Sequence, residues 1–232
     1  MNKWWLAFGC LLLALVFGAL GAWQVERRAW KLDLIARVDA RVHARPVAPP
    51  PPSAWSKVNA RDDEYRRVRV DGEFLHEQET LVQAVTELGP GYWLMTPLRT
   101  KQGLIMINRG FVPPQWRDPA TRTRCIPGEH VTITGLMRMS EPRGGFLRSN
   151  KPTLDRWYSR DVVMIAKAHG LTEEVAPFFI DAEADPKPGD FPVGGLTVIA
   201  FRNSHLVYAL TWLALCGLSL LGVALALRPK KA

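Results

Sequence analysis

Two long apolar runs dominate the pattern of hydrophobic and polar positions along the chain. Neither range 4–25 nor range 206–227 contains a charged residue. At about 1.5 Å per residue, each run is long enough as an α-helix to cross a hydrocarbon core of about 30 Å. We therefore predict two transmembrane helices. The segment between them is long enough for one ordinary domain with its own hydrophobic core.

The second run begins with polar and aromatic residues. In a helix, His205, Tyr208 and Trp212 share one face, and Cys216 and Ser219 continue that face. Polar groups in a membrane helix are costly, so by default they face a partner or a site. Two interpretations remain open for the histidine. It hydrogen-bonds at the membrane surface within an aromatic belt, or it is a neutral imidazole that binds heme iron beside aromatic surfaces.

The pattern changes twice between the first run and the domain. Apolar residues at helical spacing predict that range 26–45 extends the first helix, with its basic residues near lipid phosphates. Range 46–56 is rich in proline, which forbids a regular helix and favours extended polyproline II. We predict a stiff spacer there, followed by an extracytoplasmic domain over 57–201.

Short segments of alternating apolar residues fill most of this domain. The predicted strands lie at 65–72, 80–85, 91–99, 103–109, 130–137 and 177–181. Range 100–103 reads as a hairpin turn, and range 161–169 as a helix that ends at Gly170. The predicted fold class is a membrane protein in which two transmembrane α-helices flank a β-rich α+β domain with antiparallel strands.

The charge distribution indicates the topology. The formal net charge is +8, and all acidic residues lie between the two apolar runs. The basic residues at the outer ends of the runs are Lys3, Arg228, Lys230 and Lys231. By the positive-inside rule both termini are cytoplasmic and the domain is extracytoplasmic. Basic residues directly after the first run argue the other way, but a loop of this length is translocated regardless of its charge.

The first apolar run also has a rival interpretation as a secretory signal. Ala19 and Gly21, small residues on either side of Leu20, resemble a cleavage site. Against this, Trp4, Trp5 and Trp23 bracket the run as interfacial aromatic residues do, and the run exceeds a usual signal core. We therefore favour an uncleaved anchor.

The sequence contains no credible catalytic set. It has no G-x-S-x-G elbow and no glycine-rich phosphate loop, and its three cysteines form no CxxC pair. His76 starts a pattern like that of zinc proteases, but Thr80 stands where the second histidine is needed. We predict that the protein is not an enzyme and that His205 is its one candidate metal ligand.

Five stretches, in order, resemble the Surfeit-locus (Surf/Shy) family of cytochrome c oxidase assembly factors. They are 21–31 with Trp23 and Gln24, 70–74 with Gly72, 91–98, 108–113 with Asn108, Arg109 and Gly110, and 202–212 with Arg202 and Asn203. No single stretch is specific, but their order and the two-helix plan cover nearly the whole chain. Ser204 departs from the pattern, since asparagine is expected there.

The resemblance implies a helper in heme–copper oxidase assembly, within the respiratory chain. It implies that the protein binds heme a and passes it to the catalytic subunit of the oxidase. The heme-linked histidine of the family corresponds to His205, and its sensitive glycine and tyrosine to Gly72 and Tyr208. The residues expected to contact heme a are His205 at the iron, Tyr208, Trp212, and Arg202 and Arg27 at the propionates.

The resemblance also suggests partners and location. We expect the oxidase catalytic subunit, heme A synthase and membrane lipid as partners, and no nucleic acid. No Arg/Ser-rich transit segment precedes Trp4, which favours a bacterial inner (plasma) membrane. The main alternative is a structural assembly factor that stabilises oxidase subunits without heme. A sensor is disfavoured because range 228–232 is too short for an output domain.

Overall fold

The two apolar runs form the two long helices of the protein. The computed structural model describes residues 3–125, 130–142, 144–145, 147–184, 191–199, 201 and 203–228. Helix α1 spans Lys3–Val42 and helix α4 spans His205–Leu227. Each contains a window with a mean hydropathy of 2.2 and is long enough to cross a membrane. The prediction of two spans is confirmed, and α1 continues without a break through most of the predicted extension.

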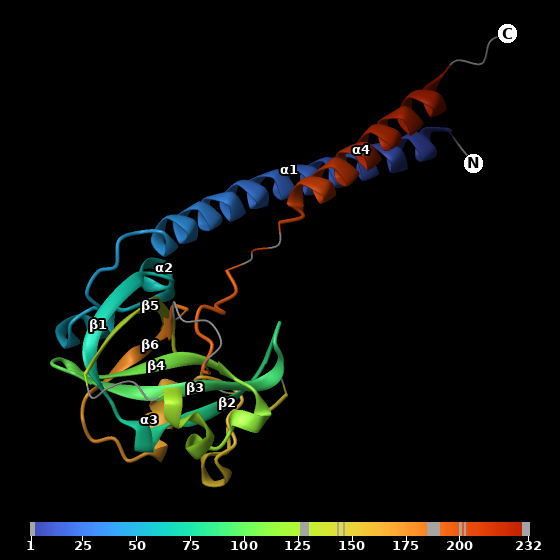
Figure 1. Ribbon diagram of the computed structural model, residues 1–232. Coiled ribbons are helices and arrows are strands. Elements are labelled where there is room, and N and C mark those ends of the chain that lie inside the picture. Colours follow the sequence, from blue (N-terminus) through green and yellow to red (C-terminus); the bar gives the residue numbers. More distant parts are fainter. Residues whose placement is uncertain are drawn as a thin grey trace. The chain divides into compact units, whose positions relative to one another are not determined.

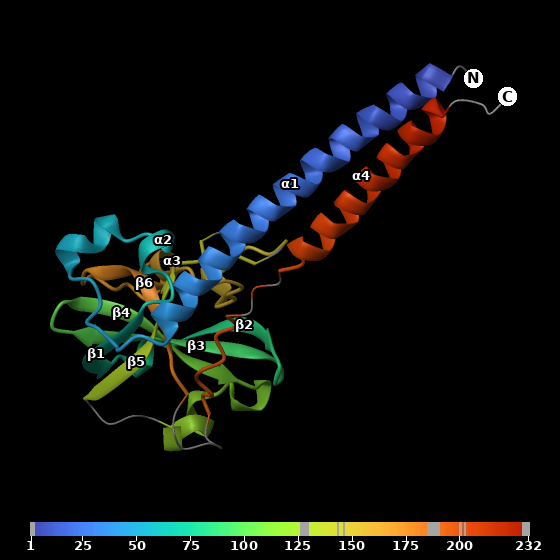
Figure 2. The same ribbon diagram turned by 90° about the horizontal axis from the view of Figure 1, so that it is seen from above.

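Helices α1 and α4 lie side by side through small residues (Figures 1 and 2). Ala7 and Ala14 of α1 and Ala209 of α4 are buried. Gly21 lies against Leu213, where an added Cβ would be 3.1 Å from a methyl carbon. Lipid tails give no hydrophobic drive for helix association, so close approach through small residues supplies the packing energy instead.

The chain forms two compact units, and the helix pair is one of them. Residues Met1–Arg37 and Ile199–Ala232 form the helical unit, and Val38–Val198 form the domain. The described residues of the domain form six strands, β1 (Arg67–Phe74), β2 (Thr80–Thr86), β3 (Gly89–Thr100), β4 (Gly103–Val112), β5 (Val131–Met139) and β6 (Val175–Ala182). All six were predicted, and the hairpin turn between β3 and β4 is where the sequence places it.

The strands form one sheet that closes on itself. Their order is β1-β5-β6-β4-β3-β2, and β1 also pairs with β3 (Figure 1). Strand β1 runs along β5 as far as Gly72 and then pairs with β3 from Glu73 onward. Strands β4 and β6 are parallel, so the prediction of antiparallel strands is wrong for this pair. The connection between them contains β5 and α3, and such a crossover permits parallel pairing.

Two hydrophobic clusters pack against opposite faces of the sheet. Neighbouring residues of β6 divide between them, because successive side chains of a strand point to opposite faces. Phe178 packs with Val68 and Ile107, whereas Phe179 packs with Met95 and Trp157. Helix α3 covers the second cluster.

Helix α3 spans Val162–Ala168 and has the predicted ends. The Asp161 carboxylate accepts a hydrogen bond from the backbone N–H of Met164 at 3.0 Å, which caps the first turn. Gly170 follows the helix with a φ of 62°, a left-handed conformation that glycine adopts without strain.

The proline-rich segment belongs to the domain. A short helix, η1, spans Pro52–Lys57 and buries Trp55 in the barrel core, while Val47 pairs with Val68 of β1. A single turn, α2 (Ala60–Asp63), follows η1. Range 46–56 was predicted to be a spacer that stands apart from the domain. It is instead part of the domain, because Trp55 is buried in the core and Val47 pairs with the sheet.

Gly72 marks the point where β1 leaves β5 for β3. A Cβ added there would lie 2.4 Å from the backbone oxygen of Arg99 and 2.9 Å from Leu98 Cγ. The first of these atoms belongs to the backbone and cannot rotate away. Gly72 is therefore required by the closure of the sheet.

We predict that Gly72→Ala lowers the free energy of unfolding by about 2 kcal/mol, since the added methyl must displace strand β3. Chemical denaturation of the purified protein measures this loss. Gly170→Asn is the matched control, because no atom lies within 4 Å of that position and asparagine tolerates its φ. Equal stability of the two variants would contradict the closure argument.

His169 links the end of α3 to the sheet. Its Nε2 atom lies 2.7 Å from the hydroxyl oxygen of Thr80 on β2. Burial lowers the pKa of His169, only partly offset by the charge of Asp155. The folded protein therefore prefers the neutral imidazole.

Stability should depend on this histidine at mildly acidic pH. The pKa of His169 in the folded protein lies below the unfolded value of about 6.5. The contribution of His169 to the free energy of unfolding is therefore complete above about pH 6.5, and it decreases as the pH falls below that value. Melting temperatures measured between pH 7.5 and 5 should fall less for His169→Gln than for wild type. His130→Gln, at an exposed position, should follow the wild-type slope.

Candidate functional site at the start of α4

His205 is the first residue of α4 and forms a hydrogen bond with α1. Its Nδ1 atom lies 2.7 Å from Oε1 of Gln24, whose side chain is buried. An amide oxygen only accepts hydrogen bonds, so Nδ1 carries the hydrogen and donates. The same tautomer leaves a lone pair on Nε2. We call Gln24, Asn203 and His205 the His205 site.

The face of α4 that carries His205 is turned toward α1. The Trp212 ring stacks on Phe17 with centroids 5.6 Å apart, and the Cys216 thiol lies 3.2 Å from the carbonyl oxygen of Ala14. The sequence indicated that this polar and aromatic face meets a partner. Helix α1 is a partner for His205, Trp212 and Cys216.

Two of the predicted aromatic positions are exposed within this unit. Tyr208 is 55% exposed and Trp23 is 54% exposed. No side-chain hydrogen bond or ring contact of Tyr208 is recorded in the part of the chain that the structure describes. The structure therefore does not bring Tyr208 onto His205, although the two residues lie one turn apart on α4.

The structure describes Arg27, one of the two predicted cations. The Arg27 guanidinium lies 3.9 Å from the ring centroid of Trp30, one turn along α1, and is exposed. Arg202 lies outside the described residues. Lys31, which the site prediction omitted, places its ammonium 5.0 Å from the ring centroid of Phe201, in the segment before α4.

Asn203 adds an unsatisfied group to the site. Its side-chain oxygen is buried, and within the described residues it has no hydrogen-bond partner. A buried acceptor without a donor costs about 1–3 kcal/mol, so its position requires an explanation.

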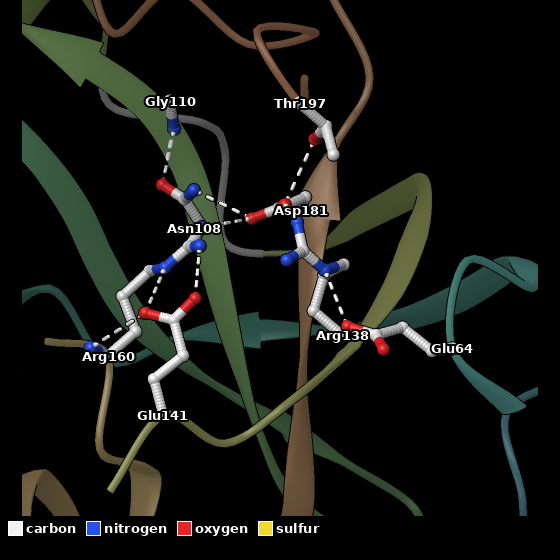
Figure 3. A network of polar contacts seen from close by, with 8 residues as sticks. All are labelled: Glu64, Asn108, Gly110, Arg138, Glu141, Arg160, Asp181 and Thr197. Carbon is white, nitrogen blue, oxygen red and sulfur yellow. Dashed lines mark hydrogen bonds and ion pairs between the residues drawn. The ribbon is translucent and has the colours of Figure 1, made fainter. Parts of the chain in front are cut away.

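The family-motif residues Asn108, Arg109 and Gly110 lie in the domain and take part in polar contacts there. The Asn108 amide donates to Asp181 at 2.8 Å and accepts from the backbone N–H of Gly110 at 3.2 Å (Figure 3). Asp181 also accepts hydrogen bonds from Arg138, Arg160 and Thr197, at 3.1, 3.1 and 2.9 Å. We call Asn108, Asp181, Arg138, Arg160 and Glu141 the Asp181 network.

Electrostatic pairing favours the charged forms of Arg138 and Glu141, two partly buried members of this network. Burial alone would lower the pKa of Arg138, but the charge of Asp181 and the further effects of Tyr65 and Glu64 outweigh it and raise that pKa. Burial by itself would raise the pKa of Glu141. The hydrogen bonds with Arg160 and the positive charge of Arg160 outweigh this effect and lower the pKa of Glu141. The two carboxylates and the two arginines of the network balance in charge within the domain. We therefore interpret the network as one that stabilises the domain.

Arg109, the remaining motif residue, belongs to a second group of buried ion pairs. Arg109 and Arg122 both contact the carboxylate of Glu79, at 3.0 and 2.9 Å. All three side chains are at most 11% exposed. Burial, and next the positive charge of Arg109, lower the pKa of neighbouring His76. In the described part of the chain, no group of three His, Cys, Asp or Glu side chains is placed to hold a metal ion.

Sequence reasoning missed Asp181, Arg138, Arg160 and Glu79. The signal was present in one place, because Asp181 directly follows three buried apolar residues of β6. A buried carboxylate needs cationic partners. Which arginines supply them depends on strand pairing that is not local in sequence.

We predict that Asp181→Asn lowers the free energy of unfolding by about 3–5 kcal/mol, because it removes the buried counter-charge that two largely buried arginines share. Denaturant titration of the purified protein measures the loss. Glu173→Ala is the control, since it breaks an exposed pair with Arg99 and should cost about 0–1 kcal/mol. Similar losses in both variants would show that the network does not stabilise the domain.

Comparisons with known proteins agree with the resemblance. The model of the SURF1 family matches residues 11–217. Surfeit locus protein 1 of Gallus gallus is 35% identical over 91% of the chain and 72% of its own length. The Homo sapiens protein of that name is 36% identical over 88% and 72%. A SURF1-like protein of Caenorhabditis elegans is 35% identical over 92% and 71%. The chain therefore belongs to the SURF1 family, the Surfeit-locus family of cytochrome c oxidase assembly factors.

Proposed function

We propose that this assembly factor binds heme a at the His205 site and delivers it to the catalytic subunit of a heme–copper oxidase. The observation that carries the proposal is the hydrogen bond between His205 Nδ1 and Gln24 Oε1. It holds the ring hydrogen on Nδ1, so that Nε2 is the ring nitrogen that would bind a metal ion. The heme is cargo, so the proposal includes no catalytic step.

The chemistry of the donor set fits heme iron. Histidines that bind metals almost always donate their other ring N–H to an oxygen acceptor, which fixes the ring and raises its basicity. Gln24 supplies this acceptor, and its burial keeps the amide from exchanging the bond for water. Nε2 of His205 is then the iron-binding atom. A single histidine suits a carrier, which must also release the heme.

The polar edge of the heme needs cations and hydrogen-bond donors. Arg27 and Lys31 lie on α1 within two turns of Gln24. Arg202 precedes Asn203 in sequence. We assign these basic residues to the propionates, since guanidinium and ammonium groups form charge-assisted hydrogen bonds with carboxylates. Tyr208 has the exposed ring surface that the macrocycle could cover.

One observation favours a second candidate function, a structural assembly factor that acts without heme. Trp212, which was expected to contact the macrocycle, already stacks on Phe17. In this interpretation the aromatic face of α4 serves only to hold the helix pair together. The experiment below separates the two functions.

We also propose a location. The basic residues at the outer ends of the two apolar runs support a topology with both termini in the cytoplasm and the domain outside. A bacterial inner membrane, with the oxidase catalytic subunit and heme A synthase as neighbours, is the setting that matches this topology.

We predict that His205→Ala removes the heme absorption bands from the detergent-purified full-length protein produced together with heme a. Gln24→Ala should weaken heme binding about 10- to 100-fold, because it removes the acceptor that orients the ligand. Optical titration measures both effects. His43→Ala replaces an exposed histidine that the site does not use, and should bind as wild type.

Retention of the full heme spectrum by His205→Ala would reject this ligand. Absence of heme from the wild-type protein, with intact binding to the oxidase subunit, would favour the structural function instead.

A further inference from the structure

Strand β2 has an outer edge with unpaired backbone groups. The Gln83 N–H donates to the carbonyl oxygen of Trp157 at 2.9 Å, so the backbone of Gln83 points away from β3. Backbone groups of a strand alternate in direction, and those of Val85 therefore point the same way. The partner of Val85 on β3 is Pro90, which has no N–H to donate. Val82 and Trp157 also form an isolated parallel bridge, so the Trp157 segment occupies this edge at Val82 and Gln83 and leaves Val85 beyond it.

Two adjoining hollows lie along this edge. Their volumes are about 580 and 260 Å³, and both are lined by Gln83, Tyr92 and Tyr158. Val85 and Pro90 line the larger hollow. An open strand edge beside a hollow of this size can accept an added strand together with its side chains.

The hollows carry excess positive charge. Arg148 lines the larger one, and Arg117 and Arg156 line the smaller. The guanidinium groups of Arg148 and Arg117 lie 5.5 and 5.7 Å from the ring centroids of Tyr158 and Tyr92. Among the described residues that line the hollows Asp155 is the one acid, and its carboxylate accepts a hydrogen bond from a buried tryptophan. The charge therefore complements an acidic ligand.

The same region exposes large apolar side chains. Val85 is 85% exposed, Leu88 at the hairpin turn 54%, and Leu147, next to Arg148, 89%. An exposed strand edge flanked by apolar side chains invites pairing with another chain, and proteins normally block such edges. Strand β2 ends the strand order of the sheet, and in the described part of the chain no named strand pairs with its outer edge.

We propose that the outer edge of β2 binds an extended acidic segment of a partner protein by strand addition. The backbone of that segment pairs with the Val85 N–H and C=O and with the Gln83 carbonyl, since the Gln83 N–H is already bound to Trp157. Its carboxylates contact Arg148 and Arg117. Its apolar side chains cover Val85. The surface lies entirely within the domain unit, so the inference does not depend on heme binding by the helical unit.

The probe is a fluorescein-labelled synthetic peptide in which glutamate alternates with valine. Fluorescence anisotropy measures its binding to the detergent-purified full-length protein. We expect saturable binding, and at least about tenfold weaker binding of the same peptide with lysine in place of glutamate. Equal binding of both peptides would overturn the charge argument.

Two variants test the contacts separately. Val85→Pro removes the outward N–H without breaking a bond to β3, and Arg148→Glu reverses one charge. Each should weaken binding about tenfold, the effect of one hydrogen bond or one charge contact. Arg69→Glu makes the same charge change at an exposed position on β1 and should leave binding unchanged.

Hydrogen exchange provides a measurement that needs no variant. Addition of the acidic peptide should slow exchange of the Val85 amide in the wild-type protein, because that amide becomes a donor to the added strand. If the peptide binds but this amide is not protected, the binding is electrostatic only and strand addition is wrong.

Discussion

The domain depends on the carboxylate of Asp181. It lies on β6, between the strands that carry its partners, Asn108 on β4 and Arg138 on β5. Arg160 and Thr197 reach it from segments outside the sheet. A buried ion pair adds little stability compared with well-packed apolar residues, but it allows one arrangement of its partners. One buried charge therefore defines how three strands and two connections meet.

In the helical unit, one polar contact to a buried side chain likewise fixes how two elements meet. Gln24 is a buried polar residue on α1, and its partner His205 comes from α4. In an apolar surrounding each residue would be costly alone, so their hydrogen bond sets the register of the two helices. The alanines and glycines of the interface permit close contact, but they do not by themselves select one register.

The sequence predicted local features well and distant ones poorly. Alternating valines predicted β1, and Asp161 and Gly170 predicted both ends of α3, because each signal is contained within a few residues. The parallel pairing of β4 with β6 and the burial of Trp55 depend on segments far apart in the chain, and no local pattern reports them. At the site, His205 was identified from its place before an apolar run. Its bond to Gln24 could not be predicted, because the helix rotation that creates it follows from packing. The arginine partners of Asp181 were missed because they depend on strand pairing between segments distant in sequence.

The distance in sequence between the two residues of that bond has a consequence for biosynthesis. Gln24 and His205 are 181 positions apart. During synthesis α1 is made first, and the whole domain must follow before α4 exists. Until then Gln24 has no partner, and a partly made chain lacks the histidine that the proposed ligand needs. The His205 site is complete only after α4 has been made. The order of synthesis therefore determines when the protein can bind its proposed ligand.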